Sequence, residues 1–274
     1  MKKALIFISI LLLVLIVVGC VNVFKLSDIT PDHVVLPNDE EKARTLLQEM
    51  GKAHGITYWD SIQTYNVKYR DEFYGFIGKQ SHPFKEQNML FSLSFIPKTF
   101  NGQMEIASGE ENGTIWGIQD GQTYKLDNGS KAVIENNKDI KFWIPTYQYF
   151  VELPSRIQEV TAADYIGTQV INGVNTEGVL VSWGTVEPQK DLDQYIIWMN
   201  AETKVIVKVE YTVRDAYRFV AGAAYYNDYK NYNGLLLPSV MPVESNLRRT
   251  GYLHQMSIES FTANPVNRAS LLPL

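Results

Sequence analysis

The chain has 274 residues, with 25 Lys and Arg against 30 Asp and Glu and a formal net charge of −5. Its largest basic cluster is the pair Arg248-Arg249, so nucleic acid is excluded as the expected partner. The content of 45% hydrophobic and 20% charged residues is that of a globular protein. The 16 Tyr, 12 Phe and 5 Trp favour β-strands.

The amino terminus has the three parts of a secretory signal. Two lysines precede an apolar run of 15 residues (4–18), and Cys20 follows after a glycine. We predict a signal peptide over residues 1–19 that is removed before Cys20. The alternative is an uncleaved anchor, because the uncharged stretch continues through Phe24 and could then cross a bilayer.

Cys20 is the only cysteine in the chain. A lipoprotein signal needs a thiol here for the attachment of acyl chains such as palmitate, whereas a plain anchor does not. We therefore predict that Cys20 is lipidated and holds the protein to a membrane of the cell envelope. Val21 follows in place of Asp, which predicts the outer membrane, facing the periplasm, where an organism has two membranes. A single cysteine also leaves no pair for an internal disulfide.

We predict a tether over residues 20–37 and one folded domain over residues 38–274. The domain begins with a helix that Asn38 caps and Gly55 ends. Acidic residues follow the cap and complement the helix dipole. The apolar residues of this helix recur at helical spacing and predict its buried face; they are Ala43, Leu46, Leu47 and Met50.

From Ile62 onward, apolar and polar residues alternate, which is typical of strands with one wet face. The clearest run predicts one face made of Val205, Val207, Val209, Tyr211 and Val213. Between strand-like runs lie dipeptides that favour tight hairpins; they are Asn112-Gly113, Asp120-Gly121, Asn128-Gly129 and Asn233-Gly234. These features predict a long antiparallel sheet.

Residues 139–160 interrupt the strands with an aromatic pattern at helical spacing: Trp143, Tyr147, Phe150 and Val151. We predict a helix with Pro145 at its first position, and a second short turn that begins at Ser155 with Gln158 completing a capping box. Helix, strands, helices and strands in this order indicate an α+β fold.

Three segments resemble the LolA/LolB-like family of outer-membrane lipoprotein-sorting proteins. The segments are Leu46–Gly55 with Trp59 and Ile62, similar to the first helix and first strand of the family; Tyr195–Asn200 with Glu202-Thr203 and the strand through Val213, similar to its central hairpin; and Tyr229–Pro238, similar to a later hairpin. They span most of residues 39–262. The resemblance implies a long curved antiparallel sheet, a half-open barrel whose apolar concave face is covered by helices, in a lipid-binding domain.

Motifs for catalysis and metal binding are lacking in the sequence. The histidines His33, His54, His82 and His254 have no metal-ligand spacing, and the chain has no GxSxG elbow and no Gly-rich phosphate loop. His254 is expected to be a core residue. We therefore expect no catalytic residue, no metal and no cofactor. An envelope hydrolase, which would need a polar cleft with titratable groups, is kept as a minor alternative.

The apolar side of the sheet either fills a core or lines a cavity. The residues expected at such a cavity are Phe91, Phe95, Trp116, Tyr147, Trp183, Val209 and Tyr211. An underfilled face would bind a lipid or the acyl chains of a lipoprotein, and the protein would be a membrane-anchored, non-catalytic carrier or receptor. The alternative is an envelope sensor or scaffold that binds an unidentified protein partner through exposed aromatic residues such as Tyr225, Tyr226 and Tyr229.

Overall fold

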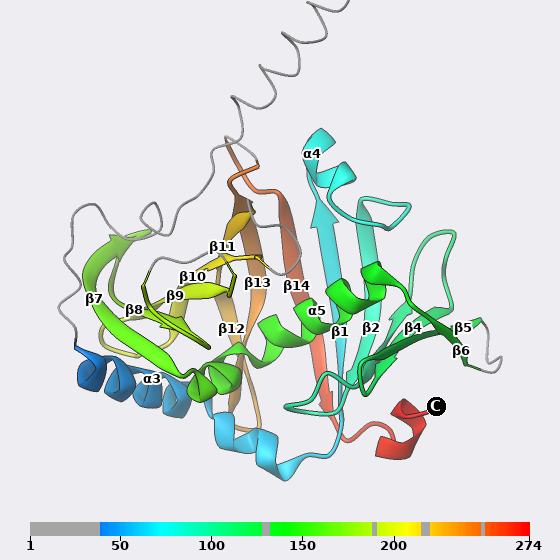
Figure 1. The fold of residues 1–274 in the computed structure, drawn as a ribbon, viewed down its shortest axis with the longest axis horizontal. Coiled ribbons are helices and arrows are strands. Elements are labelled where there is room, and N and C mark those ends of the chain that lie inside the picture. The colour runs from blue at the N-terminus through cyan, green and yellow to red at the C-terminus, as the bar shows by residue number, and fades with distance from the viewer. Residues whose placement is uncertain (1–38, 128–131, 188–190, 215–219, 248–249) are drawn as a thin grey trace, which may run out of the picture.

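The structure is a computed structural model that describes residues 39–127, 132–187, 191–214, 220–247 and 250–274 (Figure 1). The predicted signal peptide, Cys20, the tether, Asn38 and the Asn128-Gly129 turn lie outside these residues. Within them, no helix combines the length and the apolar character needed to cross a membrane.

The first helix, α3 (Glu40–His54), is where the spacing of apolar residues predicted it. Asp39 is its N-cap and accepts a hydrogen bond from the backbone N–H of Lys42. Gly55 ends the helix in a left-handed conformation, with φ of 65°. The predicted apolar face of α3 is buried against β7, β8 and β13 of the sheet described next.

One antiparallel sheet holds all fourteen strands recorded in the described residues. The strands are β1 (Tyr65–Phe73), β2 (Asn88–Phe95), β3 (Gly102–Ile106), β4 (Thr114–Gln119), β5 (Gln122–Asp127), β6 (Val133–Glu135), β7 (Ala162–Ile171), β8 (Val174–Ser182), β9 (Gln194–Asn200), β10 (Ile206–Thr212), β11 (Ala221–Tyr225), β12 (Asn227–Tyr232), β13 (Leu235–Ser245) and β14 (His254–Ala263). The predicted α+β class with a long antiparallel sheet is confirmed.

The strand order places the first and last strands side by side. It runs β6-β5-β4-β3-β2-β1-β14-β13-β11-β10-β9-β8-β7, with β12 paired to β13. The sheet therefore has one half from β1 to β6 and another from β7 to β14. The helix α5 (Lys138–Arg156) connects β6, at one edge of the sheet, to β7, at the opposite edge. It therefore lies across the concave face (Figure 1).

Short elements complete the fold. α4 (Gly75–Gln80) connects β1 to β2, and η1 (Ile56–Ser61) follows α3. η2 (Ile157–Glu159) follows α5, and η3 (Arg268–Leu271) lies near the carboxyl end of the chain.

Tight turns join several neighbouring strands. Asp120-Gly121 and Asn233-Gly234 have positive φ at both residues, as the predicted hairpins require. Asn172-Gly173, between β7 and β8, has the same geometry, with φ of 50° and 82°. This last turn was not among those predicted, although its Asn-Gly dipeptide carries the same signal.

The helix α5 begins earlier than predicted, because Asn137 caps it through hydrogen bonds from the N–H groups of Asp139 and Ile140. Pro145 therefore lies inside the helix, and the prediction that it starts the helix is wrong. A proline at this point leaves the carbonyl of residue 141 without its helical donor, but Lys141 is exposed and water can replace that donor.

The predicted capping box at Ser155 is also wrong. Ser155 is buried within the last turn of α5, and the separate 3₁₀ turn begins two residues later, at Ile157. The reason is continuity of the helix: Pro154 stands inside it rather than breaking it. The second element predicted here is thus an extension of α5.

A buried carboxylate fastens α5 to the sheet. Glu152 accepts hydrogen bonds from the hydroxyl of Tyr65 at 2.7 Å, the amide of Gln148 at 2.8 Å and the backbone N–H of Lys98 at 3.0 Å. The Arg156 guanidinium lies 2.9 Å from the same carboxylate. Burial raises the pKa of Glu152 despite these partners, which act in the opposite direction.

Ile206 and Val207 lie on the opposite faces from those predicted by simple alternation. The pairing of β10 with β9 shifts in register between Ile206 and Lys208. Ile206 therefore joins Val209 in the main core, while Val207 packs on the other face of the sheet beside Trp198. An irregularity of one residue reverses the side on which a strand presents its side chains.

Candidate functional site

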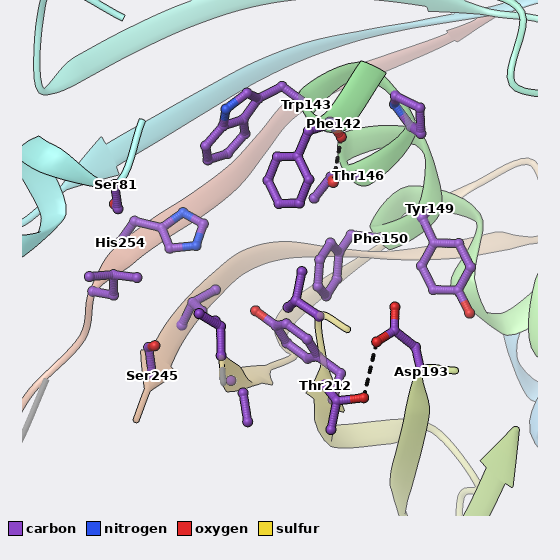
Figure 2. Close-up of a pocket in the computed structure, with 18 of the residues that line it drawn as sticks. Ser81, Phe142, Trp143, Thr146, Tyr149, Phe150, Asp193, Thr212, Ser245 and His254 are labelled. Carbon is purple, nitrogen blue, oxygen red and sulfur yellow. Dashed lines mark hydrogen bonds between the residues drawn. The ribbon is translucent and has the colours of Figure 1, made fainter. Parts of the chain in front are cut away.

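A pocket of about 540 Å³ lies between α5 and the half of the sheet that contains β9, β10, β11, β13 and β14 (Figure 2). The α5 residues that line it are Lys141, Phe142, Trp143, Pro145, Thr146, Tyr149 and Phe150. A different face of α5 is packed in the core; its members are Ile140, Ile144, Tyr147 and Val151. The helix thus seals one half of the concave face and covers a hollow over the other.

The floor of the pocket is a row of residues in register across four strands. Tyr211 pairs with Tyr195 on one side and with Gly222 on the other, and Gly222 pairs with Ser245. All four residues line the pocket. A Cβ atom at Gly222 would lie 2.8 Å from the ring of Tyr211, so glycine is what allows the ring to lie over the strand.

Aromatic rings make most of the wall. Phe150 meets Tyr211 edge to face at 5.3 Å between ring centres, and Tyr149 lies 5.6 Å from Tyr195. Trp183 extends this group, at 6.0 Å from Tyr149 and 5.7 Å from Tyr195. The wall offers apolar surface to a ligand rather than a charged lining.

One end of the pocket carries a histidine held by a buried carboxylate. The Nδ1 atom of His254 lies 2.7 Å from Asp71, and the hydroxyl of Tyr147 donates to the other oxygen of Asp71 at 2.9 Å. Asp71 is fully buried, and burial raises the pKa of its carboxyl against the opposing effects of His254 and Tyr147. These bonds fix the position of the His254 ring at the pocket wall.

The rings beside His254 form a stack. The ring of Phe73 lies between those of His254, at 5.2 Å, and His82, at 3.9 Å. Burial, together with the nearby His254, lowers the pKa of His82 to about 4. His82 is therefore neutral at neutral pH and behaves as part of the aromatic packing.

Polar groups also stand at the other side of the pocket. Asp193 accepts hydrogen bonds from the hydroxyl of Thr212 at 3.0 Å and from the backbone N–H of Arg214 at 2.6 Å. Figure 2 shows Asp193 and Thr212 across the pocket from Ser81 and His254, with Phe150 between them. An apolar centre with separated polar groups suits an amphiphilic ligand.

The geometry does not assemble a catalytic group of recognisable type in the described residues. The Asp71–His254 pair could orient a general base, but the hydroxyl of the nearby Ser81 donates to the carbonyl of Gly78 at 2.8 Å. No hydrogen bond recorded in this part of the chain joins a nucleophilic side chain to His254. The described residues also contain no group of three or more His, Cys, Asp or Glu that could hold a metal ion.

The residues that the sequence placed at a cavity have different positions. Tyr211 lines the pocket. Trp183, with 37% of its surface exposed, lies just beyond the strand β8 and contacts two residues of the pocket wall. The other five are packed in the buried core, away from this pocket: Phe91, Phe95, Trp116, Tyr147 and Val209.

Most of the pocket was missed by sequence reasoning. Phe142, Thr146 and Tyr149 recur at helical spacing and mark a second face of the helix, which could have been found. A second signal was the run of small residues 221–224, Ala-Gly-Ala-Ala, which cannot fill the space under a helix. The row of residues that forms the floor of the pocket could not be found without the register of the strands.

The tyrosines proposed as an exposed contact surface are engaged within the fold. Tyr226 is buried and donates to the carbonyl of Phe150 in α5. Tyr229 donates to the carbonyl of Ile206 at 2.8 Å, and Tyr225 donates to Glu244 at 3.0 Å. The prediction that they form an exposed surface is wrong for Tyr226, which is buried, whereas Tyr225 and Tyr229 are half-buried with their hydroxyls bonded within the fold.

The fold of this chain, a long antiparallel sheet that curves without closing with a helix across its concave face, is similar to that of solved lipoprotein-sorting and LolA superfamily proteins. Among solved structures, a domain described as an outer membrane lipoprotein-sorting protein from Vibrio parahaemolyticus has a TM-score of 0.54 and 10% identity, covering 84% of this chain and 96% of that one. A LolA superfamily protein from Nitrosomonas europaea has a TM-score of 0.51 and 11% identity, over 84% and 96% of the two chains.

A DUF1329 family protein from Desulfovibrio piger has a TM-score of 0.52 and 13% identity, over 82% of this chain and 95% of the other. The predicted resemblance is thereby confirmed at the level of the fold. No protein-family profile and no curated protein sequence matches this chain.

Proposed function

We propose that this protein is a membrane-anchored lipoprotein whose domain binds a lipid, or the acyl chains of another lipoprotein, in the pocket beneath α5. Binding is non-covalent and the protein is a carrier or receptor without catalytic activity. The observation that carries the proposal is the aromatic pocket of about 540 Å³. This volume falls within the range of about 300–1,000 Å³ that is typical of small-molecule sites.

The pocket has the right chemistry for an acyl chain. Each methylene removed from water contributes about 0.8 kcal/mol, so about eight buried methylenes would contribute roughly 6 kcal/mol before the cost of ordering the chain. Phe142, Phe150 and Tyr195 supply apolar contact surface, while His254 and Asp193 are already held by protein partners. A ligand can therefore bury its chain without leaving these charged or polar groups unpaired.

The membrane anchor in this proposal is Cys20. Acyl chains on its thiol would hold the domain at a membrane of the cell envelope, and in an organism with two membranes we place it at the outer membrane, facing the periplasm. A carrier or receptor for lipids is then already next to its source or its acceptor.

Native mass spectrometry of delipidated protein tests the pocket. The sample is the chain from Val21 to Leu274, which retains every described element, and the probes are palmitate and a diacylated lipopeptide. We expect one bound probe per chain. Thr146→Trp, which places a large ring in the pocket from α5, should weaken binding by at least about tenfold, since it takes up space equal to several methylenes.

Val170→Trp is the matched control, because Val170 is 66% exposed on β7 and does not line the pocket. It should bind like the unchanged chain. Absence of any bound probe on the unchanged chain would overturn the carrier function, and equal binding by Thr146→Trp would move the ligand to another site.

Labelling of growing cells with an alkyne fatty acid tests the anchor. The protein should take up the label, and Cys20→Ser should lose both the label and the cleavage of residues 1–19. A protein that keeps its leader and carries no label would identify residues 4–24 as an uncleaved anchor instead.

A further inference from the structure

The short helix α4 exposes large apolar side chains. Phe76 is 77% exposed and Ile77 is 41% exposed; we call these two residues the α4 tip. Phe76 is the most exposed of the large hydrophobic residues in the described part of the chain. Figure 1 shows α4 standing beyond the end of β1. The transfer of side chains of this size out of water is favourable, and within the fold these two side chains stay in water.

The α4 tip is held firmly by the segment that leads into β14. The N–H of Tyr74 donates to the carbonyl of Leu253 at 2.9 Å. Gly78 lies so close to this segment that a Cβ atom would stand 2.8 Å from the same carbonyl. The amide of Gln87 donates to the carbonyls of Phe73 and Gly75 on either side of the turn. Phe76 and Ile77 are therefore exposed on a helix that hydrogen bonds hold in a fixed position.

The carboxyl end of α4 adjoins the pocket. Gln80, the last residue of α4, and Ser81 both line the pocket and are both exposed, so the pocket reaches the surface beside α4. Leu253 and His254, which lie against the base of α4, line it as well. A surface that receives the α4 tip would consequently lie close to the opening of the pocket.

The helix α4 carries one charged side chain, the exposed Lys79, while Glu72 and Glu86 flank this segment in the sequence. Lys85 pairs with Glu110 at 3.1 Å. For Lys79 the described residues supply no recorded acidic partner. Exposed apolar side chains next to a free ammonium group are the combination that binds the interface of an anionic bilayer.

We propose that α4 docks on the surface of an anionic lipid bilayer, with Phe76 and Ile77 in the interfacial region and Lys79 near the lipid phosphates. The bilayer is favoured over a protein partner because two side chains are too small a patch for a stable protein interface, which buries about 800 Å² on each partner. The inference goes beyond ligand binding: it assigns the surface through which the pocket faces its lipid source.

The proposed anchor makes such a weak contact sufficient. Residues 21–38 could extend over at most about 60 Å, so a domain tethered at Cys20 would remain within reach of the membrane. Tethering raises the effective concentration of the bilayer at the α4 tip, and so increases the population of a contact that the untethered domain makes only at high lipid concentration.

Co-sedimentation with vesicles tests the docking surface. All described elements lie within residues 39–274, so the chain from Val21 to Leu274 keeps the fold and lacks the anchor. The vesicles contain phosphatidylethanolamine and phosphatidylglycerol at 3:1, or phosphatidylcholine alone, at a lipid concentration high enough to populate the contact without the anchor. We expect binding to the anionic vesicles, reduced by at least about tenfold in the double variant Phe76→Ser, Ile77→Ser, because each lost apolar contact is worth about one order of magnitude.

Val170→Ser is the matched control, since Val170 is exposed to a similar degree on a distant edge strand. It should sediment within twofold of the unchanged chain. Lys79→Gln should reduce binding to the anionic vesicles and leave binding to phosphatidylcholine unchanged. The double variant should still bind palmitate by native mass spectrometry, which separates docking from ligand binding.

The proposal is overturned if the unchanged chain does not sediment with anionic vesicles, or if the double variant sediments equally well. It is also overturned if Val170→Ser loses as much binding as the double variant, because the contact is then nonspecific. If the unchanged chain binds anionic vesicles but does not bind palmitate, the proposed function is contradicted and the docking surface is supported.

Discussion

His54, at the end of α3, has a defined protonation state because both of its ring nitrogens meet the backbone. Nδ1 lies 3.2 Å from the carbonyl of Leu236, and the N–H of Ile206 donates to Nε2 at 3.1 Å. Nδ1 must therefore donate and Nε2 must accept, which only one neutral tautomer can do. Burial lowers the pKa of His54 to about 4. The ring links α3 to β10 and β13 only while it is neutral.

The sign of the pH effect follows from the direction of this shift. Above pH 6.5 the ring is neutral in both states, so its contribution to stability is fully present. As the pH falls from 6.5 toward 4, the unfolded chain takes up a proton before the folded chain does, and the fold loses stability. With a pKa of about 4 in the folded state, the loss between pH 7 and pH 4.5 is about 2.5 kcal/mol.

Urea unfolding of the unchanged chain and of His54→Gln, each at pH 7 and pH 4.5, measures this contribution. Glutamine keeps one donor and one acceptor but does not titrate. The variant should be less stable by about 1 kcal/mol at pH 7, and it should lose about 2.5 kcal/mol less than the unchanged chain on acidification. His82 is present in both chains, so its contribution to the loss of stability cancels in the comparison. Equal losses in the two chains would refute the assignment of the ring as a neutral bridge.

Three further outcomes follow from the packing. Asp71→Asn removes a carboxyl whose pKa is raised by burial, and such a group destabilises the fold as the pH rises. In urea unfolding, the variant should therefore gain stability relative to the unchanged chain between pH 4 and pH 7. Val209→Ala should cost about 2 kcal/mol and Val207→Ala clearly less, because only Val209 is fully buried, and equal costs would argue against the irregularity in β10. Gly117→Ala should lower the melting temperature, since its methyl group would overlap the ring of Tyr124.

Local sequence signals predicted much of the architecture. The alternation through β1 and β2 follows from residues that pack on one side, such as Tyr65, Val67 and Phe91, all of which are buried. Asp-Gly and Asn-Gly turns carry their geometry in two residues, and Gly55 ends α3 for a similarly local reason. These signals depend on backbone preferences within a few residues, and the sequence displays them directly.

The errors in the fold arise where a distant contact overrides a local preference. An irregular pairing with β9 reverses Ile206 and Val207, and nothing in the alternation of β10 reports it. Pro145 can lie inside α5 because the tertiary structure anchors the helix on both sides of it, through Trp143 and Tyr147 in the core. Such effects depend on partners that are remote in sequence.

The site was harder to predict than the fold, because aromatic residues signal burial and do not distinguish a packed core from a cavity. Tyr147 and Phe150 are three residues apart in α5, yet Tyr147 is packed in the core and Phe150 borders the pocket. What separates the two environments is the opposite surface of the sheet. Beneath Tyr147 stands Phe91, at 5.5 Å between ring centres.

Beyond Phe150 the sheet presents Tyr211 and then, one and two strands further, Gly222 and Ser245. These two residues are too small to reach the helix. The hollow is thus set by small residues on the sheet and not by large ones on the helix. The identity of the side chains that face one another across α5 is therefore the information that decides between a sealed scaffold and a binding protein.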